Sequence, residues 1–109
     1  MDRTSKYADI LTEILYAESK VRFRLKPELK MVAACDHQTG QFFLVMVGWD
    51  KDEWVHHIVF HAQLIDGKLL IEVDNTEGLT PDLLEAGIRA EDFLSDLDYD
   101  YSEAARAAA

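Results

Sequence analysis

The chain has 109 residues, of which 49% are hydrophobic, and its 21 acidic and 11 basic side chains give a formal net charge of −10. This length predicts a single domain over residues 1–109 that buries a hydrophobic core without disulfides. Because a strongly negative chain is repelled by the nucleic-acid backbone and by anionic membranes, we expect neither direct nucleic-acid binding nor membrane binding.

Cysteine usage and the lack of targeting signals predict a location inside the cell. Cys35 is the single cysteine, so it cannot form an internal disulfide, and no cysteine pair offers metal ligands. The sequence has neither a leader peptide nor a long apolar span. We therefore expect a soluble cytoplasmic protein.

An amphipathic helix of about four turns is expected near the N-terminus, where apolar residues recur at helical spacing. These residues are Tyr7, Ile10, Leu11, Ile14 and Leu15. Thr4 or Ser5 is available as the cap of this helix. The segment from Val21 to Lys26 alternates apolar and basic residues and ends at Pro27, which is typical of an extended connector or a short edge strand.

Four strands in an antiparallel meander are expected next. They span residues 29–36, 42–49, 54–64 and 68–74. The run from Phe42 to Trp49 is apolar on both sides, so we expect it in the middle of the sheet with both faces covered. Residues 37–40 end in glycine and suit a hairpin loop, and Asp66-Gly67 readily takes the positive φ angles of a type I′ turn.

The third expected strand has one side that suits the core better than the other. The better side comprises Trp54, His56, Ile58, Phe60, Ala62 and Leu64. The opposite side comprises Val55, His57, Val59, His61 and Gln63. Because side chains alternate along a strand, we expect the first set to face the core.

A short helix is expected after the sheet, with Thr80 as its cap, Pro81 at its first position and Gly87 as its left-handed stop. Residues 89–96 form a further helical turn or two, and residues 97–109 form either a docked extension or a frayed tail. The expected fold class is α+β, with an N-terminal helix and short C-terminal helices packed on one face of a four-stranded antiparallel sheet.

The other face of that sheet also needs a partner, because the second strand is apolar on both sides. Trp49 and Trp54 flank one loop. We therefore predict that the open face or an edge meets another subunit, which makes the protein a homo-oligomer. In the alternative arrangement, the second helical segment covers this face within the monomer.

The residue types needed for catalysis or metal binding do not form a convincing constellation. His57 and His61 are four residues apart on a strand, which is about 13 Å, too far for one zinc ion. Cys35 lies in an apolar strand beside Asp36, which disfavours a thiolate. No nucleophile-elbow, phosphate-loop or metalloprotease motif occurs. We expect no enzyme activity and no cofactor.

A set of short segments, in order along the chain, resembles the XisI family, the fdxN-element excision controlling factors of cyanobacteria. The segments are Gly48-Trp49-Asp50, Val55-His56, His61, Asp66-Gly67-Lys68, Asp74-Asn75-Thr76-Glu77, Leu84-Glu85-Ala86-Gly87-Ile88 and Glu91-Asp92. The resemblance runs from the first helix to about Phe93. It departs from the family pattern at residues 94–103, which are acidic here.

The resemblance implies a small cytoplasmic α+β protein that forms oligomers and has an accessory role rather than a catalytic motif. The original member acts with XisH so that a recombinase can excise a DNA element during heterocyst differentiation. An XisH-like protein is therefore the implied partner. The candidate partner or interface residues are Trp49, Trp54, His56, His61, Thr76 and Glu77. Thr76 and Glu77 either satisfy backbone donors before the next helix or meet the partner.

Three functional hypotheses follow. The first is a non-enzymatic regulatory protein that acts with an XisH-like partner, in DNA excision or by occupying the DNA-binding surface of a nuclease-like protein. The second is a DNA-binding recombination cofactor that uses a basic cluster at Lys20, Arg22, Arg24, Lys26 and Lys30, which a solvated edge explains as well. The third is a small-molecule-binding module with a pocket around Trp49, Trp54 and His56.

Overall fold

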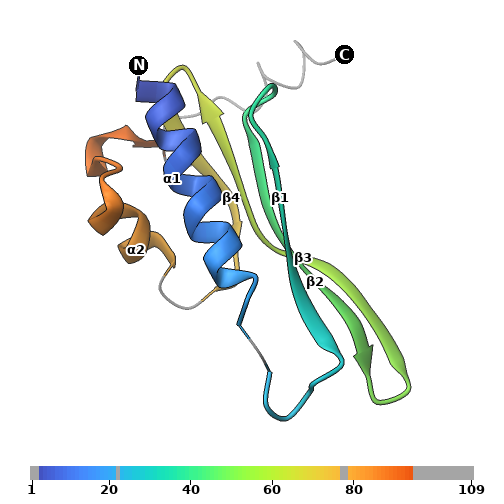
Figure 1. Cartoon of the computed structure of the whole chain (residues 1–109). Coiled ribbons are helices and arrows are strands. Elements are labelled where there is room, and N and C mark those ends of the chain that lie inside the picture. The colour runs from blue at the N-terminus through green and yellow to red at the C-terminus, as the bar shows by residue number, and fades with distance from the viewer. Residues whose placement is uncertain (1–2, 22, 77–78, 95–109) are drawn as a thin grey trace.

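The computed structural model describes residues 3–21, 23–76 and 79–94. Its elements are α1 (Arg3–Glu18), β1 (Leu29–Asp36), β2 (Gln41–Asp50), β3 (Glu53–Ile65), β4 (Lys68–Asp74), α2 (Leu79–Ala86), the 3-10 turn η1 (Ala90–Asp92) and β5 (Phe93–Leu94). The sheet order is β1-β2-β3-β4-β5 (Figure 1). β1 to β4 pair antiparallel, and β5 pairs parallel to β4. The α+β class and the meander are confirmed.

Two tight turns set the register of the meander. Gly40 closes the loop between β1 and β2 with a φ of 72°. Between β3 and β4, Asp66 and Gly67 have φ angles of 52° and 78°, as the predicted type I′ turn requires. These turns pair β1 with β2 and β3 with β4.

Both helices lie on the same face of the sheet and close one hydrophobic core against it (Figure 1). The core residues with no exposed surface include Leu11 and Leu15 of α1, Leu83 of α2, and Phe42 and Phe60 of the sheet. The alternative in which the second helical segment covers the opposite face is therefore wrong.

A buried polar tie fastens the C-terminal segment to α1. Asp92 is 1% exposed and accepts a hydrogen bond from the Tyr7 hydroxyl. The same hydroxyl accepts a hydrogen bond from the backbone N–H of Arg89 at 3.2 Å. Lys68 Nζ lies 3.5 Å from Asp92 Oδ1. This tie joins residues from the two ends of the described chain.

The helix starts differ from the prediction. α1 begins at Arg3, so Thr4 and Ser5 lie inside its first turn and do not precede it as caps. α2 begins at Leu79, and Thr80 directs its hydroxyl to Asp74 Oδ2 at 3.3 Å. The predicted stop at Gly87 is confirmed, with a φ of 122°.

The sheet also differs from the prediction in three details. β2 lies inside the sheet, between β1 and β3 as expected, but the helices cover only one of its faces. The segment before Pro27 contains a turn and is not an edge strand. After one 3-10 turn, Phe93 and Leu94 add a fifth strand where a further helical turn was expected.

The sheet extends past the helices as a hairpin that we call the arm, residues 45–58 of β2 and β3 (Figure 1). The part of the sheet beneath the helices is the covered end. Among the described residues, neither helix is long and apolar enough to cross a membrane. Arg22, Glu77 and the predicted tail 97–109 lie outside the described residues.

Candidate interaction surface

A β-bulge in β3 decides which residues of the arm face away from the helices. Leu44 pairs with Phe60, whereas the next residue, Val45, pairs with Ile58, so Val59 is an extra residue in β3. Val59 and Phe60 are both buried, at 4% and 0% exposure. Alternation along β3 is therefore reset at this point.

The reset corrects the predicted face of half of this strand. Phe60, Ala62 and Leu64 face the core as expected. Trp54, His56 and Ile58 do not, because they pair with Trp49, Val47 and Val45, which alternate with the core residues of β2. By the same argument, His56 and His61 lie on one face, although simple alternation places them on opposite faces.

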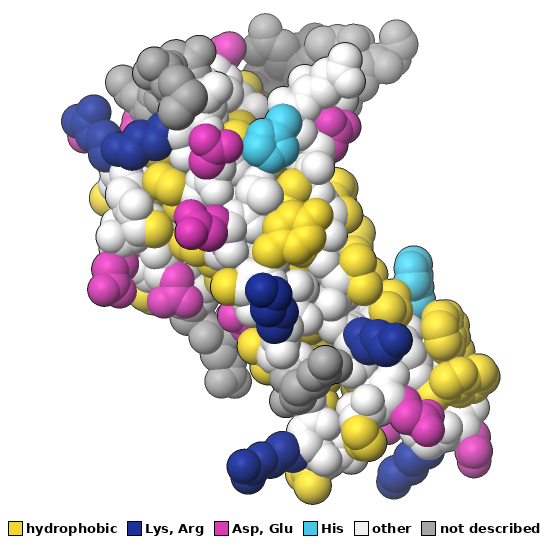
Figure 2. Space-filling view, viewed as in Figure 1, with side chains coloured by type: hydrophobic (Ala, Val, Ile, Leu, Met, Phe, Trp, Pro, Cys, Tyr) yellow, Lys and Arg dark blue, Asp and Glu magenta, His cyan; other side chains and the backbone are white. Residues whose placement is uncertain are grey.

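This face of the sheet, turned away from the helices, is the outer surface. It comprises Val32, Phe43, Val45, Val47, Trp49, Trp54, His56, Ile58 and His61, with Gln41, Gln63 and Glu72 at its polar end. Figure 2 views the molecule from the side of the helices and shows acidic side chains over the helical layer, with hydrophobic side chains at the edge of the part that extends past the helices. Several of the apolar side chains are well exposed, namely Val32, Trp49, Trp54 and Ile58.

The two tryptophans form the most prominent feature of the arm. Trp49 and Trp54 are directly opposite each other on β2 and β3, and their rings meet edge to face with centroids 5.4 Å apart. Their exposed fractions are 49% and 57%. Two large aromatic side chains thus lie half-exposed side by side, held by their mutual contact rather than by the core.

A ladder of polar side chains crosses the other end of the outer surface. Gln41 donates through its amide nitrogen to Gln63 Oε1 at 3.2 Å, so its own Oε1 accepts from His61 Nε2 at 2.8 Å. Gln63 in turn donates to Glu72 Oε1 at 2.9 Å. The His61 ring also stacks on Phe43, with ring centroids 4.1 Å apart. Burial lowers the pKa of His61, and the Glu72 carboxylate partly opposes this shift.

Thr76 lies away from the outer surface, at the end of β4. Its backbone N–H and its hydroxyl both donate to Asp74 Oδ1, at 3.0 and 2.5 Å. Asp74 also accepts from Thr80, so it joins the end of β4 to α2. The structure therefore places Trp49, Trp54, His56 and His61 on one face of the sheet, with the tryptophans and His61 at opposite ends of it, and leaves Thr76 at the end of β4.

Cys35 packs at the edge of the core rather than in a reactive setting. Burial raises the pKa of its thiol, and a hydrogen bond with Thr12 partly opposes this. The Thr12 hydroxyl donates to the Ala8 carbonyl and lies 2.7 Å from His37 Nε2. Since the thiolate is the nucleophilic form, this environment disfavours chemistry at the sulfur.

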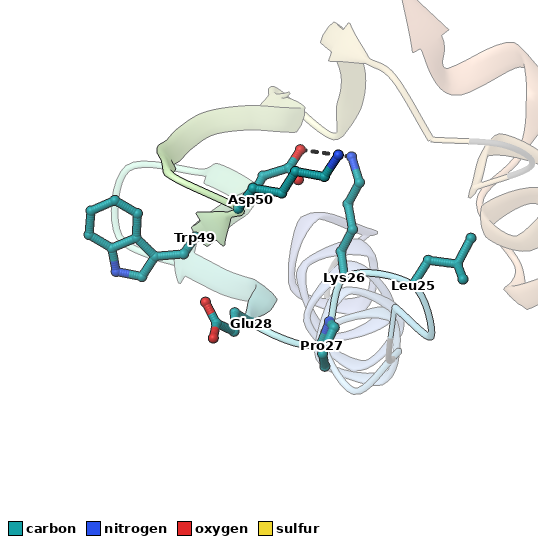
Figure 3. Close-up of a pocket in the computed structure, with 7 residues that line it drawn as sticks. Leu25, Lys26, Pro27, Glu28, Trp49 and Asp50 are labelled. Carbon is teal, nitrogen blue, oxygen red and sulfur yellow. Dashed lines mark hydrogen bonds and ion pairs between the residues drawn. The ribbon is translucent and has the colours of Figure 1, made fainter.

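A pocket of about 300 Å³ lies beside Trp49, near the tip of the arm (Figure 3). It is lined by Leu25, Lys26, Pro27, Glu28, Trp49, Asp50 and Lys51. Of the three residues of the predicted pocket, Trp49 lines this one, whereas Trp54 and His56 are not in its lining. Lys26 of the basic cluster forms an ion pair with Asp50 at 2.7 Å (Figure 3).

Gly48 shapes this pocket because another segment passes against it. Its φ is 135°, and a Cβ built there would lie 2.1 Å from the carbonyl oxygen of Glu28. The chain thus approaches Gly48 at the step from Glu28 to Leu29, where a side chain has no room. Trp49 and the pocket wall depend on this close approach.

The apolar members of the outer surface that the sequence did not single out are Val32, Phe43, Val45, Val47 and Ile58. Val45 and Val47 alternate with the core residues of β2 and so lie on the same face as Trp49. This signal was present in the sequence. Ile58 was assigned to the core because the bulge at Val59 is hidden between apolar residues. Within the described part of the chain, no group of three His, Cys, Asp or Glu side chains could hold a metal ion.

Comparison with known proteins gives one family and a consistent fold. The family model described as XisI protein matches residues 1–104. The crystal structure of the fdxN element excision controlling factor XisI from Anabaena variabilis is 26% identical, with a TM-score of 0.68 over 90% of this chain and 89% of that one. A XisI-like protein from the same organism is 22% identical and has a TM-score of 0.70 over 91% of each chain. The likeness to this second protein supports the fold alone. No curated protein matches the chain.

Proposed function

Because this chain belongs to the XisI family, we propose that it is a single-domain, cytoplasmic and non-enzymatic accessory protein that acts by binding other proteins. Its partner is an XisH-like protein, and together they act in excision of a DNA element or in restraint of a nuclease-like partner. The observation that carries this proposal is the outer surface, which exposes two tryptophans and several aliphatic side chains on one face of the sheet. Exposed apolar patches with aromatic residues are typical of protein interfaces.

The chemistry of the titratable groups supports binding over catalysis. His61 has a lowered pKa, but its ring is held between Phe43 and a hydrogen bond to Gln41. These contacts hold the His61 ring in a fixed position in the sheet, which suits a structural role better than proton transfer. The thiol of Cys35 is kept in its unreactive form by burial.

The outer surface also supports self-association. A sheet face that is apolar and not covered by the helices loses exposed hydrophobic area when it packs against a second copy. Trp49 and Trp54 stand at the end of the arm as the side chains with most area to bury, and tryptophan is enriched among the residues that dominate binding energy. We infer a homo-oligomer in which these two residues contact the other copy.

The experiment is to co-express the tagged protein with its genomic neighbours and weigh the purified complex by native mass spectrometry. The proposal predicts a stoichiometric complex that contains a neighbour-encoded chain and more than one copy of this protein. Trp49→Ser combined with Trp54→Ser should release the second copy. Tyr16→Ser is the matched control, because Tyr16 is 47% exposed but lies on α1.

Two outcomes would contradict the proposal. A monomer that co-purifies with no neighbour removes the partner hypothesis and the homo-oligomer together. If the tryptophan variant keeps the mass of the wild-type complex, the outer surface is not the interface between copies.

A further inference from the structure

The helical layer carries a second hollow, on the opposite side of the molecule from the outer surface. This groove between α1 and α2 has a volume of about 310 Å³. Its lining consists of Ile14, Ala17, Glu18, Asp82, Glu85 and Ala86. Half of these residues are apolar and half are carboxylates, and no basic residue is among those that the structure places in the lining. We call it the acidic groove.

The helix ends make the negative potential of the acidic groove stronger. Glu18 and Glu85 lie in the last turns of α1 and α2, where the helix dipole favours cations and disfavours acids. Neither last turn contains a basic residue. In the described chain, the ion pairs and side-chain hydrogen bonds include none with the carboxylates of Glu18, Asp82 or Glu85. These like charges therefore repel one another without an internal counter-charge.

The form of the acidic groove indicates which cation it fits. A metal ion is not suited, because these carboxylates do not form a group that could hold one within the described residues and because alanine and isoleucine line the space between them. A lysine or arginine side chain is suited, since its aliphatic stem packs on apolar surface while its charged head meets carboxylates. The lining of the acidic groove provides both, with apolar residues for the stem and carboxylates for the charged head.

We propose that the acidic groove binds a basic segment of the partner protein, with a lysine or arginine stem against Ile14, Ala17 and Ala86 and its head among the three carboxylates. This inference rests on the proposed function and deepens it, because it assigns the partner and the second copy to opposite sides of the molecule. The outer surface is apolar and packs against the same apolar surface of a second copy. The acidic groove takes a surface of opposite charge, such as the basic face of a nucleic-acid-binding protein.

The test uses a fluorescein-labelled amphipathic peptide of lysine and leucine as the probe and fluorescence anisotropy as the measurement. The groove variant is Glu18→Gln, Asp82→Asn and Glu85→Gln together. The matched control, Asp9→Asn, Asp52→Asn and Glu53→Gln together, removes the same charge from exposed acids that do not line the groove. We expect the groove variant to bind at least about tenfold more weakly and the control less than about threefold more weakly.

Two further readouts separate a binding site from general charge attraction. Ala17→Trp fills the groove without changing the charge, and it should weaken the peptide as the groove variant does. The double variant Glu18→Gln, Glu85→Gln should melt at a higher temperature than the wild type, because it removes acids from the C-terminal ends of two helices. Equal weakening in both charge variants, no binding by the wild type, or a lower melting temperature of the Glu18→Gln, Glu85→Gln variant would overturn the inference.

Repeating the co-expression with the groove variant separates this inference from the proposed function. If the wild type forms the complex and the groove variant loses the neighbour-encoded chain, both stand. If both proteins form the same complex, the proposed function stands and the groove is not the partner site. If the wild type forms no complex, the proposed function fails, and the peptide titration still decides whether the groove binds basic segments.

Discussion

The covered end and the arm are built from the same two strands, yet different contacts hold them in place. Beneath the helices, β2 and β3 place Leu44 and Phe60 in a core with no exposed surface. In the arm, the same strands are stabilised by pairing with each other, by the pairing of β2 with Leu29–Val32 of β1, and by the Trp49–Trp54 contact. The bulge at Val59 lies at the border between the two. The covered end thus supplies stability, and the arm presents apolar surface that the fold itself does not need.

The largest effect is expected from truncating aromatic side chains of the covered end. Phe60→Ala should lower the free energy of unfolding by about 3–5 kcal/mol, because it leaves a cavity in a closely packed core. Ile58→Ala, two residues away on the other side of the bulge, removes a side chain that is 41% exposed and should cost less than about 1.5 kcal/mol. Urea unfolding of both variants measures the difference. Equal losses would mean that Ile58 faces the core and that the bulge is misplaced.

The tip of the arm provides the next comparison. Gly48→Ala should destabilise the protein by about 3 kcal/mol or more, because its Cβ meets the Glu28 carbonyl and its φ is unfavourable for alanine. Gly87→Ala is the control, since it shares a positive φ but its Cβ comes no closer than 3.7 Å to another residue. The control should cost about 1–2 kcal/mol. Thermal unfolding of the two variants measures this difference. A Gly48→Ala protein no less stable than the control would show that the backbone at Glu28 moves to accommodate the new Cβ at little cost.

The polar tie of the covered end should matter less than its apolar core. Tyr7→Phe removes the hydroxyl that donates to the buried Asp92 carboxylate and should cost about 1.5–3 kcal/mol. Tyr16→Phe alters an exposed tyrosine on the same helix and should be neutral within about 0.5 kcal/mol. Chemical denaturation distinguishes them. If Tyr7→Phe is as mild as its control, Asp92 obtains its stabilisation from other groups.

The smallest effect is expected from the titration of His61. Because burial lowers its pKa in the folded state, the unfolded chain binds more protons than the folded chain as the pH falls below the ordinary value near 6.5. The stability of the folded state should therefore reach its full value above the ordinary pKa of histidine. It should decline as the pH falls from there to the lower pKa of His61 in the folded chain. His61→Gln should remove this part of the decline in melting temperature between pH 7.5 and pH 5, values chosen to lie about one unit or more on either side. His57→Gln is the control, and equal changes in both variants would contradict the assignment to His61.

The sequence was sufficient to predict the order of the elements because its local signals agree with one another. The apolar residues of α1 recur at helical spacing, Asp66-Gly67 takes a type I′ turn, and Gly87 ends α2. The fifth strand was not predictable in the same way. Phe93 and Leu94 form it with two residues, and their pairing with β4 depends on contacts that are distant in the sequence.

The candidate surface was predictable in part. Trp49 and Trp54 were identified because they flank one turn, and the ladder places them opposite each other. The face of His56 was not, because the extra residue of the bulge, Val59, lies between apolar residues and gives no local signal in the sequence. The acidic groove was missed because its members come from two helices that only the tertiary fold brings together.

Tryptophan emission tests most directly the central claim that the arm is an interaction surface. The chain has two tryptophans, and both are in the arm, so no other tryptophan contributes to the signal. The emission of the free protein, at low concentration, should be that of half-exposed indoles. As the protein assembles with a second copy or with its partner, followed by mass in the same samples, the account predicts a blue shift in the emission. An assembled complex whose emission stays at the wavelength of the free chain would contradict it.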